Sequence, residues 1–301
     1  QAVGTGIWDD PVSLASNIIQ RLTLGLSENT ADPNATLNNS LRLLSKWRSV
    51  LIQNTFLKNE GTKVLKGPLA GLDFLESSAE GCHVAKLLGC YEQPLHPHIQ
   101  RILLGHYTKI INIGCAEGYY AVGFARAVPN LISLAFDIDD SAQNACRQLA
   151  RKNNVSNRVE IGGRFEPKDF EKYADEAALI FCDIEGGEQE LLDPRLSPSL
   201  RHLDIIVESH ECLRPGITQT LISRFDNTHD LELVEDSGLR QLEDLPDWFH
   251  KLSHLDQLLA TWEWRSGPTP WLVMTAKNKV VSRDPLAKFI KTPTSAQLTA
   301  S

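Results

Sequence analysis

The sequence lacks any uninterrupted apolar run of eighteen residues, and its opening QAVGTGIWDDP has no basic segment leading into an apolar one. These absences argue against a membrane span and a secretory leader, so we expect a cytoplasmic protein. Its six cysteines form no CxxC pair, so we expect neither a disulfide framework nor a structural zinc site. Basic residues are few: 30 Lys and Arg against 38 Asp and Glu give a net charge of −8, which weighs against nucleic acid or an anionic membrane as the main partner.

What is present suits one large α/β domain with a cap, because 301 residues with 42% hydrophobic content can bury a sizeable core. Residues 1–107 are predicted to form a mainly helical N-terminal cap for substrate recognition or dimerisation. One expectation is a homodimer through these helices. Its two apolar stripes are Val12, Ala15, Ile18, Ile19 and Leu22, then Leu41, Leu44, Trp47, Val50 and Leu51. Residues 280–301 predict a C-terminal tail.

The pattern changes at residue 108, where short β-rich runs begin to alternate with helix-compatible stretches. The runs are 108–114, 131–136, 158–161, 178–182, 204–208, 231–235 and 271–276. Strands that alternate with helices predict a mostly parallel sheet of six to seven strands with helices on both faces, over residues 108–279. Ser141 is a candidate N-cap of the helix after the second strand, and Asp139 and Asp140 are expected as turn and helix-cap residues.

The most informative local sequence is KIINIGCAEGYYAVGFA, a buried strand that leads through Gly114 and Gly118 into a helix. Ligands of open α/β sheets bind at the carboxyl ends of the strands, so this loop is a candidate ligand site. A dinucleotide fingerprint would need the middle glycine of G-x-G-x-x-G, which is missing here. The loop therefore favours a nucleoside without phosphates, which needs no anion cradle. About twenty residues later Asp137 ends the second strand, where a carboxylate accepts hydrogen bonds from ribose hydroxyls.

Three segments, INIGCAEGYYAVGFA, AFDID and FCDIEGGEQELL, resemble the successive motifs of class I S-adenosylmethionine-dependent methyltransferases. The D-I-E-G-x-E element at Asp183–Glu188, followed by a strand that ends in Glu208, is similar to the FkbM-type branch. Members of that branch mostly methylate hydroxyls of natural products and sugars. The resemblance covers roughly residues 85 to 277. It implies a Rossmann-like sheet, S-adenosylmethionine as cofactor, and a role in the biosynthesis of an O-methylated small molecule.

The resemblance also assigns residues to the donor. The implied cofactor-binding set is Gly114, Cys115, Ala116, Glu117, Gly118, Tyr119, Asp137, Ile138 and Asp183. A second set is expected on the acceptor side, where tyrosine could close over the site and tryptophan could wall a sugar pocket. That substrate-binding set is Glu185, Tyr91, Trp264 and Arg265.

Methyl transfer from a sulfonium is an in-line displacement, so the protein must align donor and acceptor and help remove the hydroxyl proton. The candidate catalytic residues are Asp183, which follows the fourth strand, and Glu208 and His210, which end the fifth. In one version these three hold Mg²⁺ against the substrate hydroxyl. In the metal-free version His210 is the general base. Glu188 is expected to begin the next helix, where a carboxylate meets N-terminal amides.

Two other classes of function remain open from the sequence. A nicotinamide-dependent oxidoreductase would also use a Rossmann fold, although the missing glycine counts against it. A non-catalytic binding protein could keep the methyltransferase fold without the activity. For the methyltransferase, the expected partner is a small-molecule or glycosyl acceptor, with no nucleic acid and no membrane.

Overall fold

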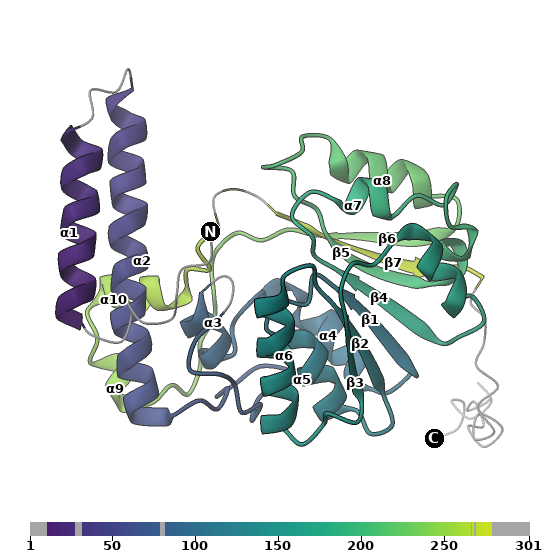
Figure 1. Ribbon diagram of the computed structural model, residues 1–301, viewed down its shortest axis with the longest axis horizontal. Coiled ribbons are helices and arrows are strands. Elements are labelled where there is room, and N and C mark those ends of the chain that lie inside the picture. Colours follow the sequence, from purple (N-terminus) through teal and green to yellow (C-terminus); the bar gives the residue numbers. More distant parts are fainter. Residues whose placement is uncertain (1–10, 28–31, 79–81, 266, 268, 279–301) are drawn as a thin grey trace, which may run out of the picture.

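Seven strands form one central sheet in the order β3-β2-β1-β4-β5-β7-β6 (Figure 1). The computed structural model describes residues 11–27, 32–78, 82–265, 267 and 269–278. Strands β1 to β5 run parallel, and β7 is antiparallel to both β5 and β6. The strands are β1 (Lys109–Ile113), β2 (Ile132–Phe136), β3 (Val159–Gly162), β4 (Ala178–Cys182), β5 (Asp204–Glu208), β6 (His229–Val234) and β7 (Trp271–Ala276).

The central strands are apolar because helices cover both faces of the sheet. Every residue of β4 and of β5 is buried, which explains why their sequences do not alternate between polar and apolar. Each run that the sequence predicts as a strand overlaps one, and the predicted Rossmann-like sheet is confirmed. Since β1 lies between β2 and β4, the carboxyl ends of these three strands meet at one edge of the sheet.

Helices on the two faces belong to separate apolar clusters. On one face Ile110 of β1 lies in the same cluster as Phe124, and on the other Ile111 lies in the same cluster as Leu221. The first face carries α4 (His96–Leu103), α5 (Tyr119–Ala127) and α6 (Asp140–Lys152), and the second α7 (Glu188–Leu191) and α8 (Ile217–Phe225). Short 3-10 helices are η1 (Gln93–Leu95), η2 (Pro167–Tyr173) and η3 (Pro198–His202).

The N-cap of α6 is one of the expected cap residues. Asp139, not Ser141, occupies the cap, and its carboxylate accepts the Ser141 backbone N–H at 2.9 Å. A carboxylate at this point also interacts favourably with the positive end of the helix, which a serine hydroxyl does less well.

A helical layer flanks the sheet and draws on both ends of the chain. It contains α1 (Pro11–Ser27), α2 (Pro33–Glu60), α3 (His83–Leu88), α9 (Asp247–His250) and α10 (His254–Thr261). The antiparallel hairpin of α1 and α2 extends away from the body of the molecule (Figure 1). Arg48 of α2 joins Asp256 of α10 in a 2.6 Å ion pair, so the late helices stack on the early ones. The predicted tail, residues 280–301, lies outside the described residues.

The apolar stripes of the hairpin lie differently from the prediction. Leu14 and Ile18 of α1 are buried in a small cluster with Val50 of α2. Ile19 and Leu41, which the stripes place inside, are each 63% exposed. The reason is that α1 packs mainly on α2, with Trp264 at the edge of their small cluster, so only a narrow seam is covered. Across the described ranges, the structure contains no helix with the length and apolar character needed to cross a membrane.

Candidate active site

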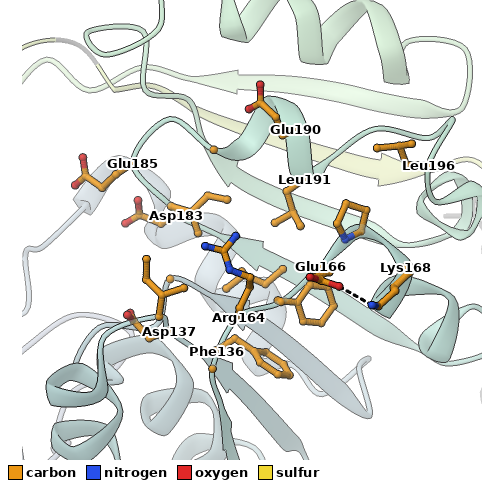
Figure 2. Close-up of a pocket in the computed structure, with 18 residues that line it drawn as sticks. Phe136, Asp137, Arg164, Glu166, Lys168, Asp183, Glu185, Glu190, Leu191 and Leu196 are labelled. Carbon is orange, nitrogen blue, oxygen red and sulfur yellow. Dashed lines mark ion pairs between the residues drawn. The ribbon is translucent and has the colours of Figure 1, made fainter.

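A cavity of about 800 Å³ opens at the carboxyl ends of β1 to β4. Its walls come from four successive strand ends, beginning with Gly114 after β1, Asp137 after β2, Arg164 after β3 and Asp183 after β4. Figure 2 shows Arg164 at the middle of the cavity, with Asp137 and Asp183 on one side of it in this view and Glu166 on the other. The cavity is therefore at the edge that the glycine loop predicts.

Gly114 is required by a close approach between two strand ends. Its φ is +77°, and a Cβ built on it would stand 1.5 Å from the backbone oxygen of Asp183. Gly118 also has positive φ, and its Cβ would meet the Cys146 sulfur at 2.5 Å. Gly114 therefore fixes Asp183 beside the loop, whereas Gly118 packs the loop on α6 and lines neither of the two cavities described here.

Asp137 is held with its carboxylate beside the glycine loop. One oxygen accepts the Ala116 N–H at 2.9 Å and the other accepts the Asp139 N–H at 2.9 Å. Each carboxylate oxygen has a second lone pair, so Asp137 can still accept hydrogen bonds from a ligand. The next residue, Ile138, is 75% exposed and lines the same cavity, which presents an apolar surface to a flat ring.

A smaller cavity of about 40 Å³ lies beyond the loop and shares Gly114 and Asp183 with the larger one. Lys86 and Glu117 form a buried ion pair of 2.5 Å in its wall. Burial raises the pKa of Glu117, but Lys86 and the Ser78 hydroxyl outweigh it and hold this pKa below its ordinary value. The smaller cavity is therefore polar and carries a fixed pair of opposite charges.

His210 lies among four carboxylates behind the Asp183 end of the larger cavity. Its Nδ1 is 2.6 Å from a Glu188 oxygen, and its Nε2 is 3.5 Å from Asp183 and 3.4 Å from Glu208. Burial lowers the pKa of His210, but the hydrogen bond to Glu188 and the charges of Glu208, Glu188 and Glu185 raise it above its ordinary value overall. Asp183 lines both cavities and His210 lines neither, so Asp183 is the member of this cluster that a ligand meets.

Glu188 begins α7, as the sequence predicts, but its side chain is fully buried against His210. One Glu188 oxygen also accepts the backbone N–H groups of Ile184 and Gly186, at 3.3 and 3.2 Å. Although burial raises the pKa of Glu188, the His210 hydrogen bond and these amides bring it below its ordinary value. Glu188 is thus an ionised partner that orients the imidazole, a role that the sequence reading missed.

Arg265 and Trp264 do not line either described cavity. The Arg265 guanidinium instead binds Glu208 and Glu92, with its Nη2 2.8 Å from the Glu92 carboxylate. Burial raises the pKa of Glu92 to about 7 against the opposing effect of Arg265, and Glu208 adds to the rise. The Trp264 ring packs near the α1–α2 hairpin, under the ammonium of Lys46. Both residues remain predictions as substrate-binding groups.

Of the other predicted residues, most do line a cavity. Ile138 and Glu185 belong to the larger one, and Tyr91 and Tyr119 to the smaller. The loop residues of the smaller cavity are Cys115, Ala116 and Glu117. Lys86 and Arg164 were missed, because a lysine within a short helix and an arginine after an edge strand carry no motif that singles them out.

Mg²⁺ fits this set of side chains poorly. Among the residues that the structure describes, two groups of three bring their ligand atoms within 4.8 Å of one another: Asp183, Glu188 and His210, and Glu92, Asp183 and Glu208. In the first group, the imidazole already bonds Glu188, and nitrogen is not a preferred ligand of Mg²⁺. In the second, Arg265 already supplies positive charge to both glutamates. The expected metal site at Asp183, Glu208 and His210 is therefore not supported.

Comparisons with known proteins give only distant likenesses. No family model matches the chain, and no curated protein matches it. Among similar solved structures, an O-methyltransferase from Bacillus cereus in complex with S-adenosylhomocysteine is 12% identical with a TM-score of 0.37, over 88% of this chain and 91% of that one. The Streptomyces achromogenes O-methyltransferase TomG, involved in tomaymycin synthesis and in complex with S-adenosylmethionine, is 13% identical with a TM-score of 0.42, over 75% and 96%.

A third similar structure, the human methyltransferase 10 domain containing protein, is 13% identical with a TM-score of 0.42, over 77% of this chain and 96% of that one. At such identities and TM-scores, the likeness carries no argument about the activity of this chain. Its fold is defined by its own strand order, and its function has to be argued from its own site.

Proposed function

We propose that the chain is an S-adenosylmethionine-dependent methyltransferase that transfers the methyl group to a hydroxyl of a small molecule, natural product or sugar. The observation that carries the proposal is that one cavity is lined by Asp137 and Ile138, by Gly114 and by Asp183. A second, smaller cavity adjoins it at Gly114 and Asp183. A nucleoside at one end and an amino acid at the other is the shape of this donor. The sequence motifs support the same assignment.

The residues suit the parts of the donor in turn. Asp137 has lone pairs left for ribose hydroxyls, and the exposed Ile138 offers an apolar surface to adenine. The smaller cavity, of about 40 Å³, suits only the terminal polar groups at the amino-acid end of the donor, beside the backbone of Cys115 and Ala116. Asp183, shared by both cavities, then lies beside the positively charged sulfonium, which its carboxylate favours.

The acceptor hydroxyl must lie in line with the methyl group, and Asp183 is the cluster member that reaches it. As the oxygen attacks the methyl carbon, the carbon–sulfur bond breaks and S-adenosylhomocysteine leaves. The hydroxyl proton passes to Asp183 and from there to the Nε2 of His210, which is 3.5 Å away. This step uses His210 in its neutral form, with Glu188 fixing the ring.

Thermal denaturation with S-adenosylhomocysteine and with NAD tests the donor. We expect S-adenosylhomocysteine to raise the melting temperature and NAD to leave it unchanged, because the loop lacks a pyrophosphate cradle. Asp137→Ala should abolish the shift, whereas Asp140→Ala, a neighbouring acid in the first turn of α6, should keep it. A shift with NAD alone would instead support the oxidoreductase, and no shift with either would support a non-catalytic protein.

We also propose that the molecule is a homodimer through the α1–α2 hairpin. On α2 the exposed residues Leu37, Leu41 and Leu44 recur at helical spacing, and on α1 Ile19 and Leu26 lie two turns apart. At about 100° per residue, both stripes lie about a quarter turn or more from the α1–α2 seam, on the same side of the antiparallel pair.

The composition of this face favours a second copy as its occupant. Arg21 is the one charged residue of α1, and residues 33–41 contain none, although a solvated helix face is usually charged. A stable dimer buries about 800 Å² on each partner, and a helical pair about 25 Å long and about 20 Å across offers an area of that order. Two such uncharged faces related by a twofold axis would form a four-helix bundle.

A further inference from the structure

Three carboxylates from distant parts of the chain converge beside the larger cavity. Glu92 precedes η1, Asp183 follows β4 and Glu208 ends β5, and one oxygen of each lies within 4.8 Å of the other two. Glu92 and Glu208 are only 2% and 3% exposed. Carboxylates this close and this buried repel one another, so they need a nearby cation or a proton on one of them.

The structure places the guanidinium of Arg265 at this point. Its Nη1 binds Glu208, its Nη2 is 2.8 Å from Glu92, and its Nε is 3.1 Å from Glu263. A planar guanidinium presents five N–H donors in fixed directions, which suits several carboxylates at once. Arg265 thus joins the segment before β7 to the end of β5 and to the segment before η1.

A second arginine, Arg240, pairs with the other acids near Arg265, so the charge of Arg265 can act on Glu92 and Glu208. Arg240 is only 1% exposed at its side chain, binds Glu263, and lies 2.6 Å from Asp236. Because Arg240 meets these two outer acids, Arg265 is not needed to balance them alone. Its two terminal nitrogens are directed at Glu92 and Glu208, the members of the convergent group.

We infer that Arg265 is a built-in cation that takes the place of a divalent metal ion in this site. It pairs with both Glu92 and Glu208, and it holds Glu208 with one oxygen on the guanidinium and the other 3.4 Å from the Nε2 of His210. Arg265 is therefore a positioning residue that acts on His210 through Glu208. The benefit to catalysis rests on the proposed function, whereas the replacement of a metal does not.

Binding of Mn²⁺ to the full chain tests the inference without any acceptor. We expect the wild type to show no one-equivalent Mn²⁺ site by electron paramagnetic resonance. Arg265→Met removes the charge but keeps an unbranched side chain, and it should create one Mn²⁺ site at least about tenfold tighter than any in the wild type. Adding Glu208→Gln to that variant should abolish the new site. Arg265→Lys, the matched control, keeps a cation and should bind like the wild type.

The wild-type titration keeps the inference falsifiable even if Arg265→Met fails to fold. One-equivalent binding of Mn²⁺ by the wild type that Asp183→Asn removes would overturn it, because a metal would then coexist with Arg265. A folded Arg265→Met protein that binds no Mn²⁺ would overturn it too. Higher thermal stability of Arg265→Met in Mn²⁺ than in chelator would support it.

The S-adenosylhomocysteine shift is measured on the same wild-type sample and judges the proposed function separately. If that shift is absent while the Mn²⁺ results hold, the donor assignment fails and the built-in cation stands. If the shift is present and the Mn²⁺ results fail, only the role of Arg265 is lost.

Discussion

Glu188 illustrates at the scale of one residue why this site depends on burial. A glutamate at the start of a helix is ordinarily exposed and interacts with the helix N-terminus alone. Here the side chain is fully buried, and its hydrogen bond to His210 raises the pKa of the imidazole. The strength of the proposed base is therefore set by a residue that lines neither cavity.

Replacing Glu188 should move the acid limb of the pH–rate profile. Activity that uses neutral His210 rises as pH passes through the His210 pKa, which lies above its ordinary value in the wild type. Glu188→Gln removes the carboxylate charge that lies beside Nδ1 of His210. The His210 pKa should then fall, so we expect the limb to shift to lower pH by about one unit. The measurement is kcat/KM against pH.

The matched control is Glu160→Gln, an exposed acid on β3. It should leave the limb in place. A lower rate for Glu188→Gln with an unshifted limb would mean that Glu188 has a structural role only.

His210 itself is tested by separating turnover from donor binding. His210→Ala should lower turnover by about 10²–10⁴-fold, because a general base contributes about that much. The melting-temperature shift with S-adenosylhomocysteine should persist, since His210 lines neither described cavity. Unchanged turnover would remove His210 from the mechanism, and a lost shift would place it at the donor instead.

At the scale of elements, the site is built where the ends of β1 and β4 touch. The register pairs Ile113 with Cys182, so the loops that follow leave the sheet side by side. Gly114 permits this contact because it has no side chain facing the backbone oxygen of Asp183. The position of Asp183 therefore depends on the residue opposite it on the neighbouring strand.

Gly114→Ala should destabilise the protein by about 3 kcal/mol or more, because it combines a left-handed backbone with a backbone clash. It should also abolish the shift with S-adenosylhomocysteine by displacing Asp183. Gly216→Ala is the control, since its backbone is also left-handed, with φ +86° and ψ 4°, but its Cβ would meet nothing within 4 Å. We expect that control to cost about 1–2 kcal/mol and to keep donor binding. Equal costs in chemical denaturation would show that the close approach does not matter.

At the scale of the whole molecule, the proposed homodimer depends on the α1–α2 hairpin. The covered seam between α1 and α2 is narrow, and Leu37, Leu41 and Leu44 of α2 remain exposed. The stripe on α2 is thus apolar, as protein interfaces are, although it is exposed to solvent.

Charge on that stripe should separate the proposed dimer. We expect the double variant Leu37→Glu and Leu41→Glu to be a monomer by multi-angle light scattering, with the S-adenosylhomocysteine shift retained, because the donor site lies on the sheet. The control is Leu104→Glu, a 73% exposed leucine after α4, which should remain a dimer. A monomeric wild type at micromolar concentration would refute this proposal.

The sequence by itself determined the sheet and the part of the cavity formed by the glycine loop and Asp137. Apolar runs of strand length, separated by helix-compatible stretches, allow few arrangements other than a parallel sheet. The glycine loop and Asp137 follow successive strands, so their meeting is a consequence of strand order alone. Local pattern suffices there because the residues involved are near one another in sequence.

Only the tertiary structure decided the charged cluster around Arg265 and the outer face of the hairpin. Glu92, Glu208 and Arg265 are brought together from segments more than fifty residues apart, and no local pattern encodes such a meeting. Helical periodicity likewise identified Ile19 and Leu41 as apolar but not which of them the neighbouring helix would cover. The physical reason is the same: burial and charge pairing depend on what packs against a residue, and that is fixed by the whole fold.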